Sequence, residues 1–378
     1  MASPVADPLT AGSAESIRCR YCHGARGEVV LDLGRQPGCE QFAEPGDDGP
    51  DPRYPLRMWL CASCGLAQLA EDPGLPETVL GLEPRSMRQQ AEHVLDRLAA
   101  EGLMRAGQTV AEFGSPHGSA WLPRLRHRGL VPEAGRADLV FDVYGLLHEP
   151  NQSDALLSRA ARLAPGGLLV FQMFSLGSVV RLGQWDELRH GHHGYWSLPA
   201  LDEALGHYGL GVHRAWSTPL AGGTLVALAN RTPDPDRDTR ALIEAERGAV
   251  SAGEVRALQK RADTEAARLR EWLVDRKRAR RRVIGYGAAS RAVPLLCHAG
   301  IDDDLLLAVA DASPGKQRRR MPGTRIPVIA PDYLRQGQPA DVLLLLPHLL
   351  DEVRHSVPEV EERGGRWVRV DDVLAGRA

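Results

Sequence analysis

Four of the six cysteines form two pairs with the same spacing, and these pairs constrain the fold more than any other feature of the sequence. Two residues separate Cys19 from Cys22, and two separate Cys61 from Cys64. Each such turn can direct two thiolates at one ion, and two turns complete the tetrahedral shell of Zn²⁺. Because protein ligands would fill all four positions, we expect a closed, structural zinc site. A redox role for one pair would leave the other unexplained.

Length and composition favour a soluble protein of several domains. A chain of 378 residues is too long for one ordinary core. The net charge of -3 gives no reason to expect nucleic acid or an anionic membrane as a partner. No apolar run approaches the roughly 20 residues that span a bilayer. Residues 1–16 lack the features of a secretory signal, so we expect a disordered lead and a cytoplasmic protein.

The order of the predicted elements indicates an α/β protein. Helical and strand patterns alternate after the cysteine region, which is typical of mostly parallel sheets. The second unit begins with a strand and the turn Gly285-Tyr286-Gly287, but it lacks the third glycine of a dinucleotide site, so NAD is not expected. We predict a zinc domain over 17–78, a central domain over 79–232, a linker and long helix over 233–281, and a C-terminal α/β domain over 282–378.

A glycine-containing loop lies between a strand and a helix in the central domain. The strand ends at Glu112-Phe113-Gly114, Gly118 lies in the loop, and the helix begins near Ser119. This arrangement can place backbone N–H groups against a cofactor. An ordinary strand-to-helix turn explains the same pattern equally well.

Residues 189–197 read RHGHHGYWS and are the densest group of histidines in the chain. Imidazole has an ordinary pKa of about 6.5, so it is well suited to abstract a proton at neutral pH. A metal site is a weaker interpretation, because the segment has no obvious carboxylate or distant ligand set. A polar surface loop remains an alternative.

Together these motifs resemble the three-domain sugar C-methyltransferases, which act on nucleotide-linked keto-deoxysugars in antibiotic pathways. The resemblance covers roughly residues 17–373 and implies a zinc domain, a middle S-adenosylmethionine (SAM) domain and a C-terminal Rossmann-like domain. It rests on CRYCHG at 19–24, AEFGSPHGS at 111–119, ARLAPGGLLVF at 161–171, RHGHHGYW at 189–196 and YGAASRAVPLL at 286–296.

The resemblance also implies a reaction. A base removes the proton alpha to a ketone, and the resulting carbanion takes the methyl group of SAM. It assigns the base to His192, a supporting role to His148, and retained positions of the opening stretch to His190 and Tyr195. A neighbouring donor would stabilise the enolate oxygen. The implied partner is a small molecule, a nucleotide-linked sugar.

The chain departs from the family pattern beside the predicted base. Gly191 stands where the family has a glutamate, and Arg189 stands where it has a tyrosine. A carboxylate next to a histidine raises its basicity and fixes its tautomer. We therefore expect His192 to be less well supported than the family base.

A larger departure concerns the SAM domain. After Gly129 only seven residues, LVPEAGR, precede what resembles the fourth strand of the domain. Seven residues span at most about 25 Å and cannot hold a strand, a helix and another strand. The acidic residue for the SAM ribose and much of the adenine pocket are therefore expected to be missing. Glu112, Gly114 and Gly118 would contact SAM only if it still binds.

These observations favour a divergent family enzyme that keeps proton abstraction but has lost methyl transfer from SAM. Epimerisation, isomerisation or elimination on a carbonyl substrate would then be the reaction. Two alternatives stay open: a SAM-dependent C-methyltransferase, and a non-catalytic partner of a pathway enzyme.

Overall fold

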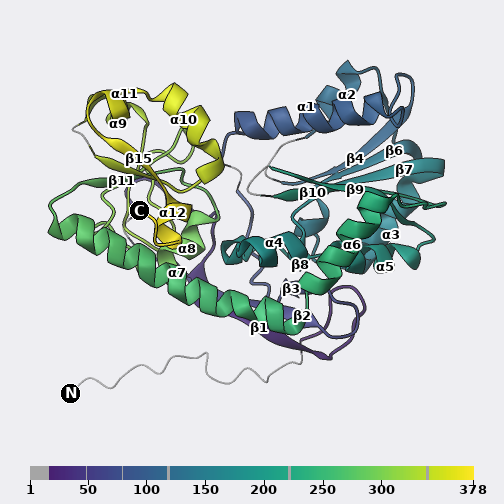
Figure 1. Ribbon diagram of the computed structural model, residues 1–378, viewed down its shortest axis with the longest axis horizontal. Helices are drawn as coiled ribbons and strands as arrows, with labels where there is room; N and C mark the ends of the chain where they lie inside the picture. Colours follow the sequence, from purple (N-terminus) through teal and green to yellow (C-terminus); the bar gives the residue numbers. More distant parts are fainter. Residues whose placement is uncertain (1–16, 48, 79, 117–119, 220–222, 338–339) are drawn as a thin grey trace.

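The computed structural model describes residues 17–47, 49–78, 80–116, 120–219, 223–337 and 340–378. These residues form three sheets, which confirms the predicted α/β class with two Rossmann-like parts. Figure 1 shows two α/β lobes side by side, with the N-terminal sheet and the long helix α7 below them.

The N-terminal sheet follows the first cysteine pair and contains the histidine segment as its edge. Its strand order is β1-β2-β3-β8, with all neighbours antiparallel. Ala67 pairs with Tyr195 and Gln68 pairs with Gly194, so the histidine segment, expected to be a loop, ends in a short strand. The strands are β1 (Gly27–Pro37), β2 (Arg53–Cys61), β3 (Ala67–Leu69) and β8 (Gly194–Tyr195).

The central sheet has the order β5-β4-β6-β7-β10-β9. The first four strands are parallel, and β10 is antiparallel to both neighbours. The strands are β4 (Thr109–Gly114), β5 (Val131–Pro132), β6 (Ala137–Val143), β7 (Leu163–Met173), β9 (Gly211–Thr218) and β10 (Thr224–Asn230).

Helices cover both faces of this sheet. Helices α1 and α2 share one hydrophobic core with the strands, and α3, α5 and α6 share another. The helices are α1 (Arg85–Ala100), α2 (Leu122–His127), α3 (Gln152–Arg162), α4 (Leu176–Leu182), α5 (Leu198–Gly206) and α6 (Arg237–Ala249), with short 3₁₀ turns η1 (Leu146–His148) and η2 (Trp185–Glu187).

The C-terminal sheet is parallel throughout, in the order β13-β12-β11-β14-β15. This is a Rossmann-like arrangement, with β11 at the point where the strand order reverses. The strands are β11 (Val283–Tyr286), β12 (Val309–Ala310), β13 (Val328–Ile329), β14 (Asp341–Leu344) and β15 (Arg366–Arg369). The helical elements are α8 (Ala292–His298), α9 (Asp332–Gln336), η4 (Pro347–Leu349), α10 (Leu350–Ser356), α11 (Glu359–Glu362) and α12 (Val370–Leu374).

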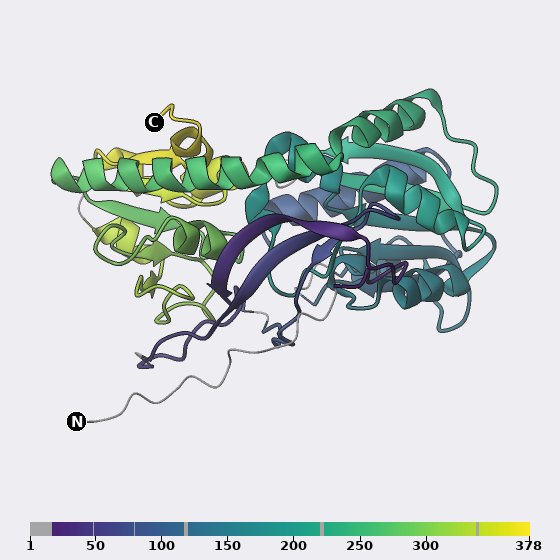
Figure 2. The same ribbon diagram turned by 90° about the horizontal axis from the view of Figure 1, so that it is seen from below.

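Helix α7 (Ala252–Arg278) connects the parts. Ser251 accepts a hydrogen bond from Glu254 N and so caps the helix, which separates α7 from α6 within the predicted helical region. Figures 1 and 2 show α7 extending from the N-terminal sheet along the C-terminal lobe, and it contacts β1, α8 and α12. Its buried residues join the core beneath β1. Among the described residues no helix is both long and apolar enough to cross a membrane.

Replacing Leu269 in α7 with alanine tests this connecting role. Leu269 is 0% exposed in the core that α7 shares with β1 and α8. We expect Leu269→Ala to lower the free energy of unfolding by about 2–5 kcal/mol, because the truncation leaves a cavity. Leu307→Ala is the control, since Leu307 is 43% exposed. Urea unfolding curves that coincide for the two variants would contradict the packing of α7.

Candidate functional site

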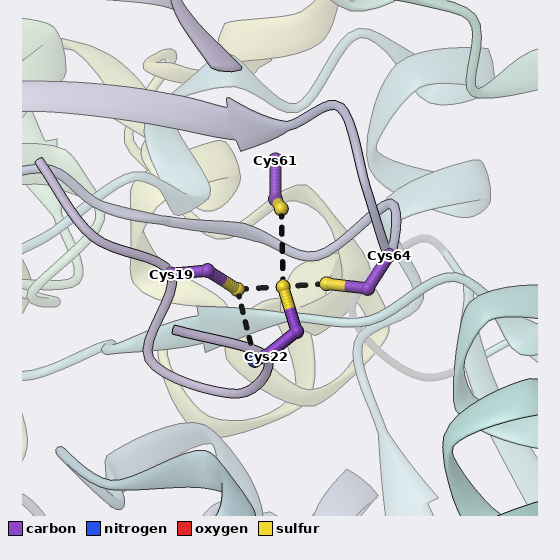
Figure 3. A group of neighbouring side chains, drawn as sticks. All are labelled: Cys19, Cys22, Cys61 and Cys64. Carbon is purple, nitrogen blue, oxygen red and sulfur yellow. Dashed lines mark hydrogen bonds between the residues drawn. The ribbon is translucent and has the colours of Figure 1, made fainter. Parts of the chain in front are cut away.

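The four paired cysteines form one compact cluster (Figure 3), and within the described residues it has the donor set of a zinc site. Their ligand atoms all lie within 4.8 Å of one another. The Sγ atoms of Cys19 and Cys64 are 3.5 Å apart, and those of Cys22 and Cys61 are 3.6 Å apart. Tetrahedral zinc with Zn–S bonds of about 2.3 Å requires sulfur separations of about 3.8 Å. The cluster therefore fits Zn²⁺ with four protein ligands.

Backbone groups around the cluster favour thiolates. The N–H groups of Tyr21 and Cys22 donate to Cys19 Sγ at 3.4 and 3.5 Å, and Ser63 N–H donates to Cys61 Sγ at 3.4 Å. The hydrogen bond with the Cys64 thiol is the main cause that lowers the pKa of Cys19 to about 5. Zinc would hold these turns in place and would supply no open coordination position for catalysis.

A cleft of about 610 Å³ lies between the central sheet and the C-terminal lobe. It opens at the carboxyl ends of strands in both lobes, where ligands bind in open α/β sheets. A larger groove of about 910 Å³ lies between α7 and the C-terminal lobe and holds none of the predicted catalytic residues. Polar residues from both lobes line the smaller cleft, among them Ser115, His148, Arg189, His192, Arg291 and Lys316.

His148 and His192 meet on the wall of this cleft. His148 ends η1 just after β6, and His192 precedes β8 in the N-terminal sheet. Their rings are 5.0 Å apart and nearly perpendicular, at 87°. His148 Nε2 lies 3.2 Å from Ser115 Oγ, and its Nδ1 lies 3.0 Å from a carboxylate oxygen of Glu77. Two predicted residues from separate elements thus form an imidazole pair.

The other two residues predicted from the histidine segment lie away from the cleft lining. His190 Nε2 donates to Pro55 O at 3.1 Å, and burial lowers the pKa of His190. Tyr195 is fully buried, its hydroxyl donates to Glu187 O at 2.8 Å, and burial raises the pKa of that hydroxyl. These contacts give both residues a structural role in holding the segment, and a catalytic role stays a prediction.

A charged network joins the histidine segment to the C-terminal lobe. Arg291 donates to both carboxylate oxygens of Asp186 at 2.9 Å and lies 3.2 Å from Glu187. Glu187 also pairs with Arg189 at 3.1 Å, and Arg189 donates to Ser290. Arg291 was not predicted as a site residue. Its partners Asp186 and Glu187 are about 105 positions away in the sequence, so no local pattern indicates the contact.

The residues predicted to contact SAM are only partly present. Glu112 accepts hydrogen bonds from Trp121 N at 2.6 Å and Leu122 N at 2.9 Å, so its carboxylate holds the start of α2. Burial raises the pKa of Glu112, and the two N–H donors oppose that rise. A side chain added at Gly114 would meet no atom of the described residues within 4 Å. Gly118 lies outside the described residues.

The adenosine side of a SAM site does not fit the residues that are present. The connection after Gly129 is described throughout, and it contributes only the two-residue strand β5. Pro132 pairs with Val110, four residues before Gly114, which places the end of β5 about 13 Å below the loop. Glu133 is the acid in this connection, and its side chain accepts from Gly135 N at 2.7 Å. The connection after Gly129 is therefore as short as the sequence predicts, and the loss of the adenosine site stays a prediction.

Fold and site together define a mixed α/β protein with a four-cysteine cluster that fits Zn²⁺ and two Rossmann-like sheets. Comparison with known proteins agrees. The family model "Putative zinc binding domain" matches residues 19–73, and the model "C-methyltransferase C-terminal domain" matches residues 219–370. C-methyltransferase NovU from Streptomyces niveus is 24% identical over 398 aligned positions, covering 93% of this chain and 94% of NovU. The chain is therefore similar to C-methyltransferases at both ends and to NovU along most of its length.

Solved methyltransferase structures overlap a smaller part of the chain. Magnesium protoporphyrin IX methyltransferase from Synechocystis, with bound SAH, is 14% identical and has a TM-score of 0.30, covering 39% of this chain and 85% of its own. The 1,6-didemethyltoxoflavin-N1-methyltransferase from Burkholderia thailandensis is 21% identical with a TM-score of 0.28, covering 40% of this chain and 80% of its own.

Removing one zinc ligand should release the metal. We expect the native protein to hold one Zn²⁺ at the cysteine cluster and Cys61→Ser to lose it, with a lower melting temperature, because binding energy is also folding energy at such sites. Cys297→Ser is the control, since Cys297 lies outside the cluster. Elemental analysis of both purified variants measures the zinc content per chain. Full zinc occupancy in Cys61→Ser would contradict the assignment.

Acid should destabilise the protein partly through His348, which lies beside Arg291. Burial, with a contribution from Arg291, lowers the pKa of His348 to about 4, whereas an unfolded histidine has a pKa near 6.5. The unfolded state then binds more protons between these values, so stability is complete above pH 6.5 and falls as pH drops towards 4. His348→Gln should remove up to roughly 3 kcal/mol of this loss. Urea unfolding at pH 7.5 and 4.5 compares the variants, and an identical acid loss in both would refute the assignment.

Proposed function

We propose that this protein removes the proton alpha to the carbonyl of a nucleotide-linked keto-sugar and does not transfer a methyl group from SAM. His192 is the base, and His148 assists it from the other side of the pair. The observation that carries the proposal is the meeting of these two imidazoles, 5.0 Å apart, on the wall of the interdomain cleft.

An imidazole pair can move a proton in both directions. One neutral ring takes the alpha proton, the electron pair shifts to the carbonyl oxygen, and a nearby donor stabilises the enolate. Returning the proton to the other face of the carbon gives an epimer, and returning it to a different atom gives an isomer. Loss of a leaving group from the neighbouring carbon gives elimination.

Loss of methyl transfer is supported by the short strand β5. A bound cofactor is normally enclosed over most of its surface. Here the end of β5 lies far below Gly114, and the connecting residues provide neither a third strand nor an acid level with the loop. The chain nevertheless keeps both histidines, so the deprotonation step does not depend on the missing part.

A second candidate function is SAM-dependent C-methylation of the same kind of substrate. It is favoured by the similarity to NovU over 93% of the chain and by the space that the described residues leave beside Gly114. In that case the adenosine would be held by elements other than those of the central sheet. Titration calorimetry with SAM separates the two candidates: we expect no binding, and a micromolar Kd would overturn the SAM-independent proposal.

Solvent exchange measures the proposed chemistry. In D₂O the native enzyme should exchange the proton alpha to the ketone in one of a panel of nucleoside diphosphate-linked keto-deoxysugars, followed by proton NMR. His192→Ala should slow the exchange by about 10²-fold or more, because it removes the base. His355→Ala is a matched control on an exposed histidine. Equal rates in the His192 variant and the native enzyme would exclude His192, and no exchange with any substrate would favour a non-catalytic binding protein.

A further inference from the structure

We infer that Glu77 is a positioning residue of the histidine pair, which fixes the tautomer of His148 so that Nε2 accepts protons on the cleft side. This inference rests on the proposed function and extends it. Glu77 lies in the segment between β3 and α1. No sequence motif around it predicts a functional role.

The hydrogen bonds of His148 define its tautomer. A carboxylate can only accept, so the 3.0 Å contact between Glu77 Oε1 and His148 Nδ1 places the ring proton on Nδ1. Nε2 then carries the lone pair, and Ser115 Oγ, 3.2 Å away, donates to it. This is the orientation that a carboxylate imposes on a general-base histidine.

The Glu77 carboxylate lies against a glycine of the histidine segment. The segment from Arg189 to Ser197 contains no carboxylate of its own. Gly191 has φ +88°, and a side chain added there would place its first carbon 2.6 Å from Glu77 Oε1. Gly191 therefore leaves the space that the Glu77 carboxylate fills, one residue from His192.

The carboxylate also stabilises the protonated ring. Opposite charges at hydrogen-bond distance attract each other more strongly where water is partly excluded. Glu77 is 19% exposed and His148 8% exposed, so water screens the pair only partly. His148 therefore becomes a second proton acceptor beside His192, rather than a spectator.

Other ionisable groups surround the pair. His192 faces the His148 ring, and His193 lies 3.6 Å from Asp72 on the N-terminal sheet side. Burial raises the pKa of the Cys39 thiol to about 12, so that neighbour stays neutral. The pH dependence of the rate will report the coupled histidines together.

Substitution of Glu77 tests the inference by the same exchange assay. We expect Glu77→Gln to lower kcat for exchange by about 10- to 10²-fold, with little change in KM, and to move the acid limb of the rate profile down by about one pH unit. Glu77→Asp should restore part of the rate, because it keeps the charge. Glu71→Gln is the control, since Glu71 pairs with Arg57 away from the cleft. A Glu77→Gln enzyme with native kcat and pH profile would overturn the inference.

Two further measurements separate this inference from the proposed function. NMR of ¹⁵N-histidine-labelled native protein should show His148 protonated at Nδ1, whether or not any sugar turns over; the Nε2-protonated form would overturn the inference. Ser115→Ala should keep at least a tenth of native activity, because its hydroxyl donates to the assisting histidine His148 and not to the proposed base His192; complete loss would contradict the role of Nε2.

A double-mutant cycle uses the contact with Gly191. Gly191→Ala should displace the carboxylate and reduce kcat as Glu77→Ala does, while adding little in the Glu77→Ala background. Fully additive losses, in variants that remain folded by thermal melting, would refute the contact. If the native enzyme shows no exchange at all, the proposed function fails while the tautomer measurement still decides the role of Glu77.

Discussion

The pairing of β3 with the short strand β8 is the interaction on which the candidate site depends. Cys61 ends β2 and Cys64 ends the turn that leads to β3, so the cysteine cluster fixes the sheet that receives β8. Leu69 N donates to His193 O at 3.3 Å, and His193 N donates to Leu147 O at 2.7 Å. These bonds attach the histidine segment to the N-terminal sheet on one side and to the η1 turn on the other. The four-cysteine cluster thus supports the sheet that holds the proposed base, without contacting that residue.

The buried charges between the lobes fix the relative orientation of the lobes more than they raise the free energy of unfolding. Asp186, Glu187, Arg189 and Arg291 form a network with little exposed surface. Removing two charges from water costs about as much as their attraction returns, so such a network is weak evidence for stability. Removing one member is different, because it leaves an unpaired buried charge at a cost of roughly 3–5 kcal/mol. Domain orientations that break the network are therefore disfavoured, and the cleft keeps one shape with Arg189 and Ser290 on opposite lobes.

The parts of this architecture that could be predicted from the sequence are those with local signals. The spacing of the cysteines predicts the metal cluster, and the seven residues after Gly129 predict the truncated central sheet, because chain length limits what a connection can hold. The strand β8 could not be predicted in the same way, since two residues carry no periodicity and the partner strand is far away in the sequence. Glu77 was missed for the same reason. Its function arises from contacts with His148 and Gly191, each in a different segment, and no pattern around residue 77 reports them.

In the proposed function, proton abstraction and methyl transfer would use different parts of this fold, so that one could be lost without the other. The short strand β5 is at the edge of the central sheet, whereas His148 follows β6 in its interior and His192 lies two residues before β8 of the N-terminal sheet. Although the edge strand β5 is short, β4 and β6 remain paired over five positions. Glu77 reaches the pair from a third segment, so the acid–base group has its own support. In the proposed function, a carbanion formed in this cleft would have water and protonated imidazoles as its nearest proton sources, so reprotonation would be the reaction that follows.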